Sequence, residues 1–264
     1  MIKLFSLYCL IALAILTSGR SFAQTKTLAA KENELVSLYA KLKGDPDQID
    51  KNATRFANEL AAVLKANPAT LTYPFKKLTD KIFCFTQTSA DGKFRVYSWD
   101  TESGGTMHFF NQIYQWSDNS KVFTKVLKYS EEEGGDAGYF CSKIYTVTIK
   151  NKNYYLVISN GVYSTKDASQ SISVFTIDNE KLNDTVELFK TKTSTLNRID
   201  VGFDFFSVVD RPERPLELIT YDDKRKIVYI PVVDDQGKVS KRNILYQLKG
   251  SYFEFIGIET GKRN

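Results

Sequence analysis

The only histidine of the chain, His108, is the first residue whose type suggests chemistry. It follows Gly104 and Gly105 closely, and Asp100 and Glu102 precede the two glycines. A histidine that a carboxylate orients is a typical general base, so this segment is one hypothesis for a catalytic site. The same residues also fit an ordinary loop, in which the glycines supply positive φ and His108 begins the next strand. A single histidine excludes a His-rich zinc site.

Two other charged segments could bind an ion. Glu131 to Asp136 form an acidic, glycine-rich loop of the kind that offers oxygen ligands to calcium, although a solvated loop explains it equally well. Arg211-Pro212-Glu213-Arg214-Pro215 is stiff and carries two guanidinium groups that could hold a carboxylate or sulfate. It could also simply connect two strands. We therefore assign no metal site, no catalytic residue and no cofactor.

Aromatic side chains are the most suggestive feature of the sequence. Strand alternation over Thr106–Trp116 places every second side chain, from His108 to Trp116, on one face. A mixed face of Tyr and Trp with Arg and Gln can stack sugar rings or bind a protein partner. Core packing is the alternative, because aromatic residues favour strands in any case. The candidate ligand platform consists of Arg95, Tyr97, Trp99, His108, Tyr114 and Trp116.

Enzyme motifs are otherwise missing from the sequence: it has no G-x-S-x-G elbow, H-E-x-x-H, Walker loop or dinucleotide fingerprint. A carboxylate pair for glycoside hydrolysis is set by the fold and not by sequence spacing. Asp100, Glu102, Asp204 and Asp210 are therefore all possible members of such a pair.

These observations favour a binding or interaction module without catalysis, whose partner is a glycan or an envelope protein. A carboxylate-dependent hydrolase acting on carbohydrate is the alternative, and a structural accessory of other envelope proteins is the third. The formal charge of +5 is spread along the chain, so we expect no nucleic-acid partner.

Residues 95–101, RVYSWDT, and the following Gly104-Gly105-Thr106-Met107-His108 resemble a segment of uncharacterised exported proteins from Bacteroidota-type Gram-negative bacteria. The composition, rich in Lys, Asn, Thr and Tyr, is similar too. The resemblance covers about fifteen residues. It implies an address in the cell envelope and brings no activity and no site residues with it.

The first residues predict export. Lys3 precedes an apolar run from Leu4 to Leu16, and Ser21-Phe22-Ala23 supplies small residues at positions −3 and −1 of a signal-peptidase site. The run is too short to span a bilayer as a membrane anchor would. We expect cleavage between Ala23 and Gln24, no membrane span afterwards, and a periplasmic or secreted protein.

Cleavage would leave two cysteines, Cys84 and Cys141. An oxidising compartment allows them to pair, and the bridge would close a loop of 58 residues, which the chain-entropy model values at roughly 4 kcal/mol. We expect a disulfide here; two buried free thiols are the alternative.

Two kinds of element must position these residues. Helical periodicity predicts a hairpin of helices over Leu28–Lys43 and Asn52–Ala66. From Tyr73 the period becomes two, and Asp91-Gly92 marks a tight β-hairpin. The resulting domains are a signal peptide over 1–23, a helical hairpin over 24–72 and an antiparallel β domain over 73–264.

The β domain is expected to hold about 12–13 strands in antiparallel meanders, because the connections are short. The strands group in units of about four that begin near Lys81, Tyr139 and Phe203. This mainly β pattern predicts a propeller-like array, a sandwich or one large twisted sheet.

Overall fold

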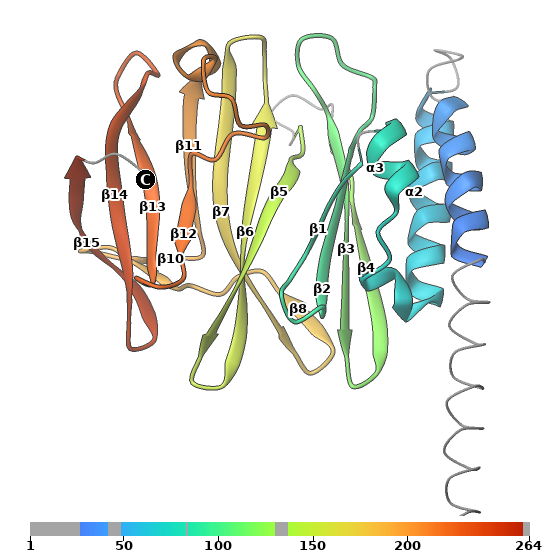
Figure 1. Ribbon diagram of the computed structural model, residues 1–264, viewed down its shortest axis with the longest axis horizontal. Helices are drawn as coiled ribbons and strands as arrows, with labels where there is room; N and C mark the ends of the chain where they lie inside the picture. The colour runs from blue at the N-terminus through green and yellow to red at the C-terminus, as the bar shows by residue number, and fades with distance from the viewer. Residues whose placement is uncertain (1–26, 42–48, 83, 130–136, 261–264) are drawn as a thin grey trace, which may run out of the picture.

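The computed structural model describes residues 27–41, 49–82, 84–129 and 137–260. The chain is a row of layers: helices at one end, then three β-sheets in succession (Figure 1). This confirms the mainly β fold with an N-terminal helical hairpin, and the three sheets do not close into a barrel. The expected signal peptide, its cleavage site at Ala23 and Gln24, and the acidic loop over 131–136 lie outside the described residues. No helix in the described part is both long and apolar enough to cross a membrane.

The helical layer covers the outer face of the first sheet. It consists of a helix over residues 27–40, α2 (Ile49–Ala66), the short 3-10 helix η3 (Pro68–Leu71) and α3 (Lys76–Ile82). Phe56, Leu60 and Leu64 recur at helical spacing on α2 and are fully buried because they pack against Tyr97 and Trp99 of the sheet. The predicted hairpin is thus present and buries its apolar stripe on the β domain.

The first sheet, sheet A, is a simple meander in the order β1-β2-β3-β4. Its strands are β1 (Phe85–Thr88), β2 (Phe94–Asp100), β3 (Phe110–Asp118) and β4 (Lys121–Leu127). Gly92 adopts a φ of 68° in the turn before β2, so the predicted Asp91-Gly92 hairpin is confirmed.

Sheet B is the middle layer and contains the longest strands. Its order is β11-β7-β6-β5, with β8 paired to β7. The strands are β5 (Phe140–Ile149), β6 (Lys152–Val162), β7 (Asp167–Asp178), β8 (Lys181–Asn183) and β11 (Arg198–Asp204).

Sheet C forms the far end of the row. Its order is β10-β9-β15-β14-β13-β12, and β9 and β15 run parallel. The strands are β9 (Phe189–Lys190), β10 (Thr195–Leu196), β12 (Thr220–Asp222), β13 (Ile227–Val233), β14 (Val239–Lys249) and β15 (Tyr252–Thr260).

The prediction that a third unit of strands begins near Phe203 is wrong. The chain enters sheet C at β9, returns to sheet B for β11, and only then completes sheet C. Phe203 ends β11, and the apolar run that follows is the 3-10 helix η4 (Phe205–Val208). Its start is fixed locally, because the Asp204 carboxylate accepts a hydrogen bond from the Phe206 N–H.

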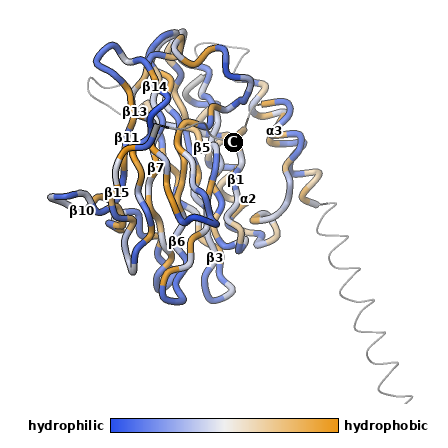
Figure 2. Tube along the Cα trace, turned by 60° about the vertical axis from the view of Figure 1, so that its left-hand side comes forward, coloured by the Kyte–Doolittle hydropathy of each residue, from blue (hydrophilic) through white to orange (hydrophobic). Residues whose placement is uncertain are grey.

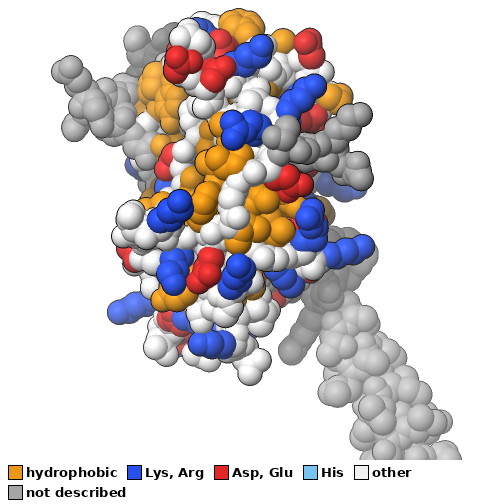
Figure 3. All heavy atoms as spheres, turned by 90° about the vertical axis from the view of Figure 1, so that its left-hand side faces the viewer, with side chains coloured by type: hydrophobic (Ala, Val, Ile, Leu, Met, Phe, Trp, Pro, Cys, Tyr) orange, Lys and Arg blue, Asp and Glu red, His pale blue; other side chains and the backbone are white. Residues whose placement is uncertain are grey.

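Four hydrophobic clusters make up the core of the described residues. One lies between the helices and sheet A, one between sheets A and B, and one between sheets B and C. A smaller fourth cluster includes Phe203, Val208 and Leu218. Hydrophobic residues accordingly follow the strands, and hydrophilic residues gather at the hairpin ends (Figure 2). The outer face of sheet C carries an apolar strip among Lys and Arg side chains (Figure 3), where Tyr252 and Ile256 are 40% and 39% exposed.

The expected disulfide is absent: Cys84 and Cys141 are both buried free thiols. Cys84 packs in the core between the helices and sheet A. Cys141 packs in the core between sheets A and B. The first sheet therefore stands between the two sulfur atoms, and a bridge would require one side chain to pass through it.

Candidate binding cleft

The six residues of the predicted platform do not form one exposed surface. Arg95, Tyr97 and Trp99 are buried against the helical layer, at 3%, 0% and 0% exposure. Tyr114 and Trp116 are buried on the opposite face of sheet A, against sheet B. Alternation assigned the faces correctly, but both faces of this sheet are covered by another layer, which alternation cannot reveal.

Arg95 has a structural position. Its Nη1 donates to the backbone carbonyls of Thr70, Leu71 and Tyr73, at 2.9, 3.2 and 2.6 Å. The guanidinium carbon lies 4.9 Å from the centre of the Tyr97 ring. Burial lowers the pKa of the Arg95 guanidinium. Carbonyl dipoles and the face of an aromatic ring stabilise the guanidinium in place of a carboxylate. Arg95 thus fastens the turn after α2 to sheet A.

His108 is the exposed member of the platform. It pairs with a carboxylate, as the hypothesis of a general base requires. Its Nδ1 lies 2.5 Å from Asp100 Oδ2, and the imidazole is 46% exposed. The Tyr39 hydroxyl donates to the Asp100 carbonyl and to Glu102 Oε1. The imidazole also stacks over the Phe110 ring, at 6.3 Å between centroids. Phe110 links this pair to the cleft described next.

A cleft of about 320 Å³ opens between sheets A and B. One wall comes from β3 and the end of β4, and the other from β7 and the start of β11. Its volume falls at the small end of ligand pockets, which span roughly 300–1,000 Å³. Its lining is Phe110, Gln112, Tyr114, Leu127, Lys128, Gly138, Tyr139, Ser173, Phe175, Asp184, Asn197 and Arg198.

The sheet B side of this interface carries a row of hydroxyl groups. Ser169, Ser171 and Ser173 alternate along β7 on the face turned to sheet A, the face of Phe175. Ser171 Oγ is buried without a hydrogen-bond partner among the described residues. On the neighbouring strand Gly202 stands opposite Ser169, and the space that a side chain would fill there is open.

The sheet A wall adds an amide with spare hydrogen-bonding capacity. Gln112 is 6% exposed, and its two hydrogen bonds are long, 3.3 Å to Ser98 Oγ and 3.4 Å from the Tyr114 hydroxyl. A glutamine amide offers two donors and two acceptor positions. The Gln112 side chain can therefore take on further partners in the cleft.

Charges around the cleft are largely compensated. Arg198 Nε donates to both oxygens of Asp200, at 2.8 and 2.9 Å, and its guanidinium lies over the Tyr139 ring at 4.6 Å. Asp184 pairs with Lys125 at 3.2 Å. A ligand in the cleft consequently meets mainly dipoles and ring faces, and the one lining cation without an ion-pair partner among the described residues is the exposed Lys128.

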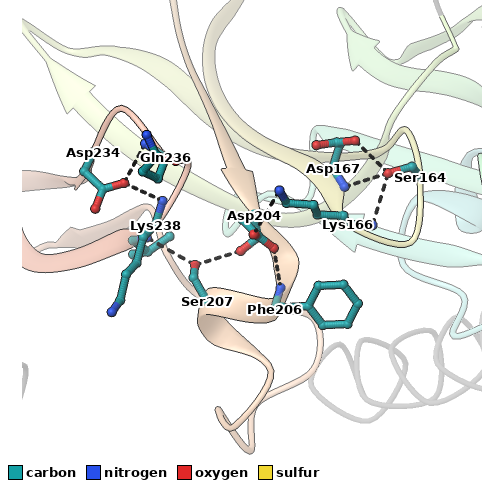
Figure 4. Close-up of polar contacts among 10 residues, drawn as sticks. Ser164, Lys166, Asp167, Asp204, Phe206, Ser207, Asp234, Gln236 and Lys238 are labelled. Atoms are coloured by element: carbon teal, nitrogen blue, oxygen red, sulfur yellow. Dashed lines mark hydrogen bonds and ion pairs between the residues drawn. The ribbon is translucent and has the colours of Figure 1, made fainter.

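Two of the remaining charged candidates, Asp204 and Arg214, bond to nearby loop residues. Asp204 faces Lys166 at 3.6 Å and belongs to a polar cluster formed by three loop segments (Figure 4). In the Arg211–Pro215 segment, Arg214 Nη1 donates to the carbonyls of Arg211 and Glu213. Within the described ranges no three His, Cys, Asp or Glu side chains are grouped so that they could hold a metal ion.

Sequence reasoning found one wall of the cleft and missed the other. The face through Phe110, Gln112 and Tyr114 was predicted, whereas the serine row and Arg198 were not. A signal was present, since Ser169-Gln-Ser-Ile-Ser173 alternates small hydroxyl residues along a strand. Which sheet face they occupy, and that β11 lies beside them, depends on long-range pairing.

The fold and the cleft define a layered antiparallel β protein with a helical cap and a small polar–aromatic pocket between its first two sheets. No protein-family model, curated protein or solved structure matches the chain. Function is therefore inferred from the cleft itself.

Proposed function

We propose that this chain is an exported, non-catalytic binding module and that the cleft between sheets A and B holds its ligand. The single observation that carries the proposal is the cleft lining, which combines the rings of Phe110, Tyr114 and Phe175 with two nearly buried polar side chains, Gln112 and Ser173. Pockets of this kind, apolar with a few placed polar groups, are the usual form of small-ligand sites.

Export is supported by the N-terminal sequence, where Lys3, the apolar run to Leu16 and the small residues before Gln24 follow the order of a secretory signal. Expression of the full chain in a Gram-negative host, fractionation and mass determination of the N-terminus test this part. Recovery of a chain beginning at Gln24 from the periplasm or medium is expected. An intact Met1 in the cytoplasm would contradict it.

The binding role is tested by thermal unfolding of the exported protein with a panel of glycans, anions, small apolar probes and envelope extracts. A ligand at a hundred times its Kd stabilises the folded state by roughly 2.7 kcal/mol. The matched variant is Ser173→Trp, which fills the cleft from β7. The proposal requires that any stabilisation of the parent protein be lost in this variant; a shift that survives unchanged places binding elsewhere.

A carboxylate-dependent hydrolase acting on carbohydrate is the second candidate, and one observation favours it. The Asp100–His108 pair lies beside the cleft, in contact with Phe110, and a histidine that a carboxylate orients can act as a base. Release of reducing ends from glycans, abolished by His108→Gln and by Asp100→Asn, would establish this activity. Binding without any release of reducing ends would favour the module.

A further inference from the structure

The ligand class follows from the chemistry of the two cleft walls. We propose, resting on the binding role above, that the cleft takes a short neutral carbohydrate of one or two sugar rings. Three features of the described residues lead to this class: paired donor and acceptor groups, flat apolar surface, and compensated charge.

The first feature is the kind of polar group present. Ser173 lies in the lining and Ser171 is its neighbour on the same strand face, while Gln112 faces them from β3. Hydroxyl and amide groups both donate and accept, which suits a ligand whose own groups are hydroxyls. Ser171 Oγ, buried beside this lining, also has no hydrogen-bond partner among the described residues.

The second feature is the apolar part of the lining. Phe110, Tyr114 and Phe175 contribute ring carbon to the cleft, and Tyr114 meets Phe175 edge to face at 5.3 Å. Sugar rings present C–H faces as well as hydroxyl edges, so aromatic rings beside Gln112 and Ser173 suit both parts of one sugar ring. A purely apolar ligand would give Gln112 and Ser173 no hydrogen-bond partner, and a buried polar group left unpaired costs about 1–3 kcal/mol.

The third feature is the partial compensation of charge in the lining. The Arg198 guanidinium already binds both oxygens of Asp200, and the Lys125 ammonium is paired with Asp184. Lys128 is an exposed lining residue without an ion-pair partner among the described residues. A neutral ring leaves both ion pairs in place, and the anionic probes below test whether Lys128 instead selects an acidic sugar.

Isothermal titration of the exported protein with three probe groups tests the inference. The neutral probes are cellobiose, lactose, xylobiose and N,N′-diacetylchitobiose. Digalacturonate and inorganic sulfate are the anionic probes, and the uncharged N-phenyl-1-naphthylamine is the apolar probe. We expect at least one neutral disaccharide to bind, and Gln112→Leu to weaken it roughly tenfold to hundredfold, because the amide loses its bonds to the ligand. The matched control, Gln236→Leu in an exposed turn, should bind as the parent does.

Folding does not obscure the Gln112→Leu result, because Gln112 makes only the two long bonds described and leucine has a similar volume. Its unfolding midpoint should equal or exceed that of the parent, which shows that lost binding is not lost structure.

Each other outcome overturns a distinct statement. A neutral disaccharide that binds Gln112→Leu as tightly as the parent overturns the cleft as the carbohydrate site. Binding of only an anionic or the apolar probe, abolished by Ser173→Trp, overturns the neutral-carbohydrate class and keeps the binding module. No binding of any neutral probe at 10 mM, roughly a hundredfold above a Kd of ~0.1 mM, overturns the carbohydrate inference. The proposed binding module is also overturned if the Ser173→Trp variant binds every probe and extract as the parent protein does.

Discussion

Replacement of Arg95 by methionine is the sharpest test of how the helical layer is attached. The guanidinium is 3% exposed and its Nη1 holds three carbonyls of the segment that links α2 to α3. Methionine fills a similar volume and packs between Phe75 and Tyr97, so the substitution removes the hydrogen bonds with little loss of apolar contact.

The expected loss of stability is about 2–4 kcal/mol. Hydrogen bonds from a charged donor contribute roughly 1.5–3 kcal/mol, and each carbonyl left buried without a partner adds about 1–3 kcal/mol. Two carbonyls keep a donor: the Tyr97 hydroxyl also bonds the Thr70 carbonyl at 2.8 Å, and the Thr88 hydroxyl bonds the Leu71 carbonyl at 3.4 Å. The penalty is therefore assigned chiefly to Tyr73. Relief of the buried charge offsets part of it.

Urea unfolding measures this difference, and hydrogen exchange locates it. Arg95→Met should lower the free energy of unfolding by the stated amount and speed exchange of the amides over residues 67–75. The exposed Arg242 provides the control: Arg242→Met should change stability by less than about 0.5 kcal/mol. A stability of Arg95→Met equal to that of the parent would refute the view that Arg95 fastens the helical layer.

Three further predictions concern other parts of the molecule. Cys84 and Cys141 should resist a thiol reagent in the folded protein and both react after denaturation without reductant, since burial raises the pKa of the Cys84 thiol to about 12; a single bridged species would contradict this. Burial alone would raise the pKa of Asp91, but bonds from Ser89 and Asn153 outweigh it and lower the pKa. The stabilisation by Asp91 is therefore present above the unfolded pKa of about 3.9 and disappears as pH falls through the folded value, so Asp91→Asn should flatten the acid limb of a stability–pH curve. Gly138→Ala should destabilise the protein more than Gly250→Ala does. Both glycines have positive φ, but only at Gly138 would the added carbon meet the Phe110 carbonyl, at 1.9 Å. Equal losses of stability in urea unfolding would show that backbone strain alone determines the effect.

Much of the architecture could be predicted from residues that are close in sequence. The helical stripe of α2 and the Asp91-Gly92 turn each depend on residues close in sequence, and both are present where the patterns put them. The unit of strands expected to begin near Phe203 failed for an equally local reason: Asp204 is a good N-cap, and its bond to the Phe206 N–H starts a 3-10 helix.

Long-range pairing explains what sequence patterns could not give. The return of β11 to sheet B leaves no periodicity in the chain, and yet it brings Arg198 opposite Ser173. The disulfide expectation failed similarly, because alternation does not say which layer covers which face of a sheet. One wall of the cleft could be predicted, because β3 supplies it from one continuous segment. The other wall consists of β7 and β11, which the strands β9 and β10 of sheet C separate in the sequence.

The two faces of β7 show that the polar wall is not a requirement of folding. Toward sheet C, Ile172 and Val174 join a continuous apolar core. Toward sheet A, the same stretch presents Ser171 and Ser173, and Ser171 leaves its hydroxyl unpaired. An apolar residue at such a position would add burial and remove an unpaired group, so stability alone favours valine or alanine there. Under the proposed binding role, a ligand that pairs with Ser173 accounts for this polar stretch, and Ser171→Ala should raise the stability of the ligand-free protein or leave it unchanged.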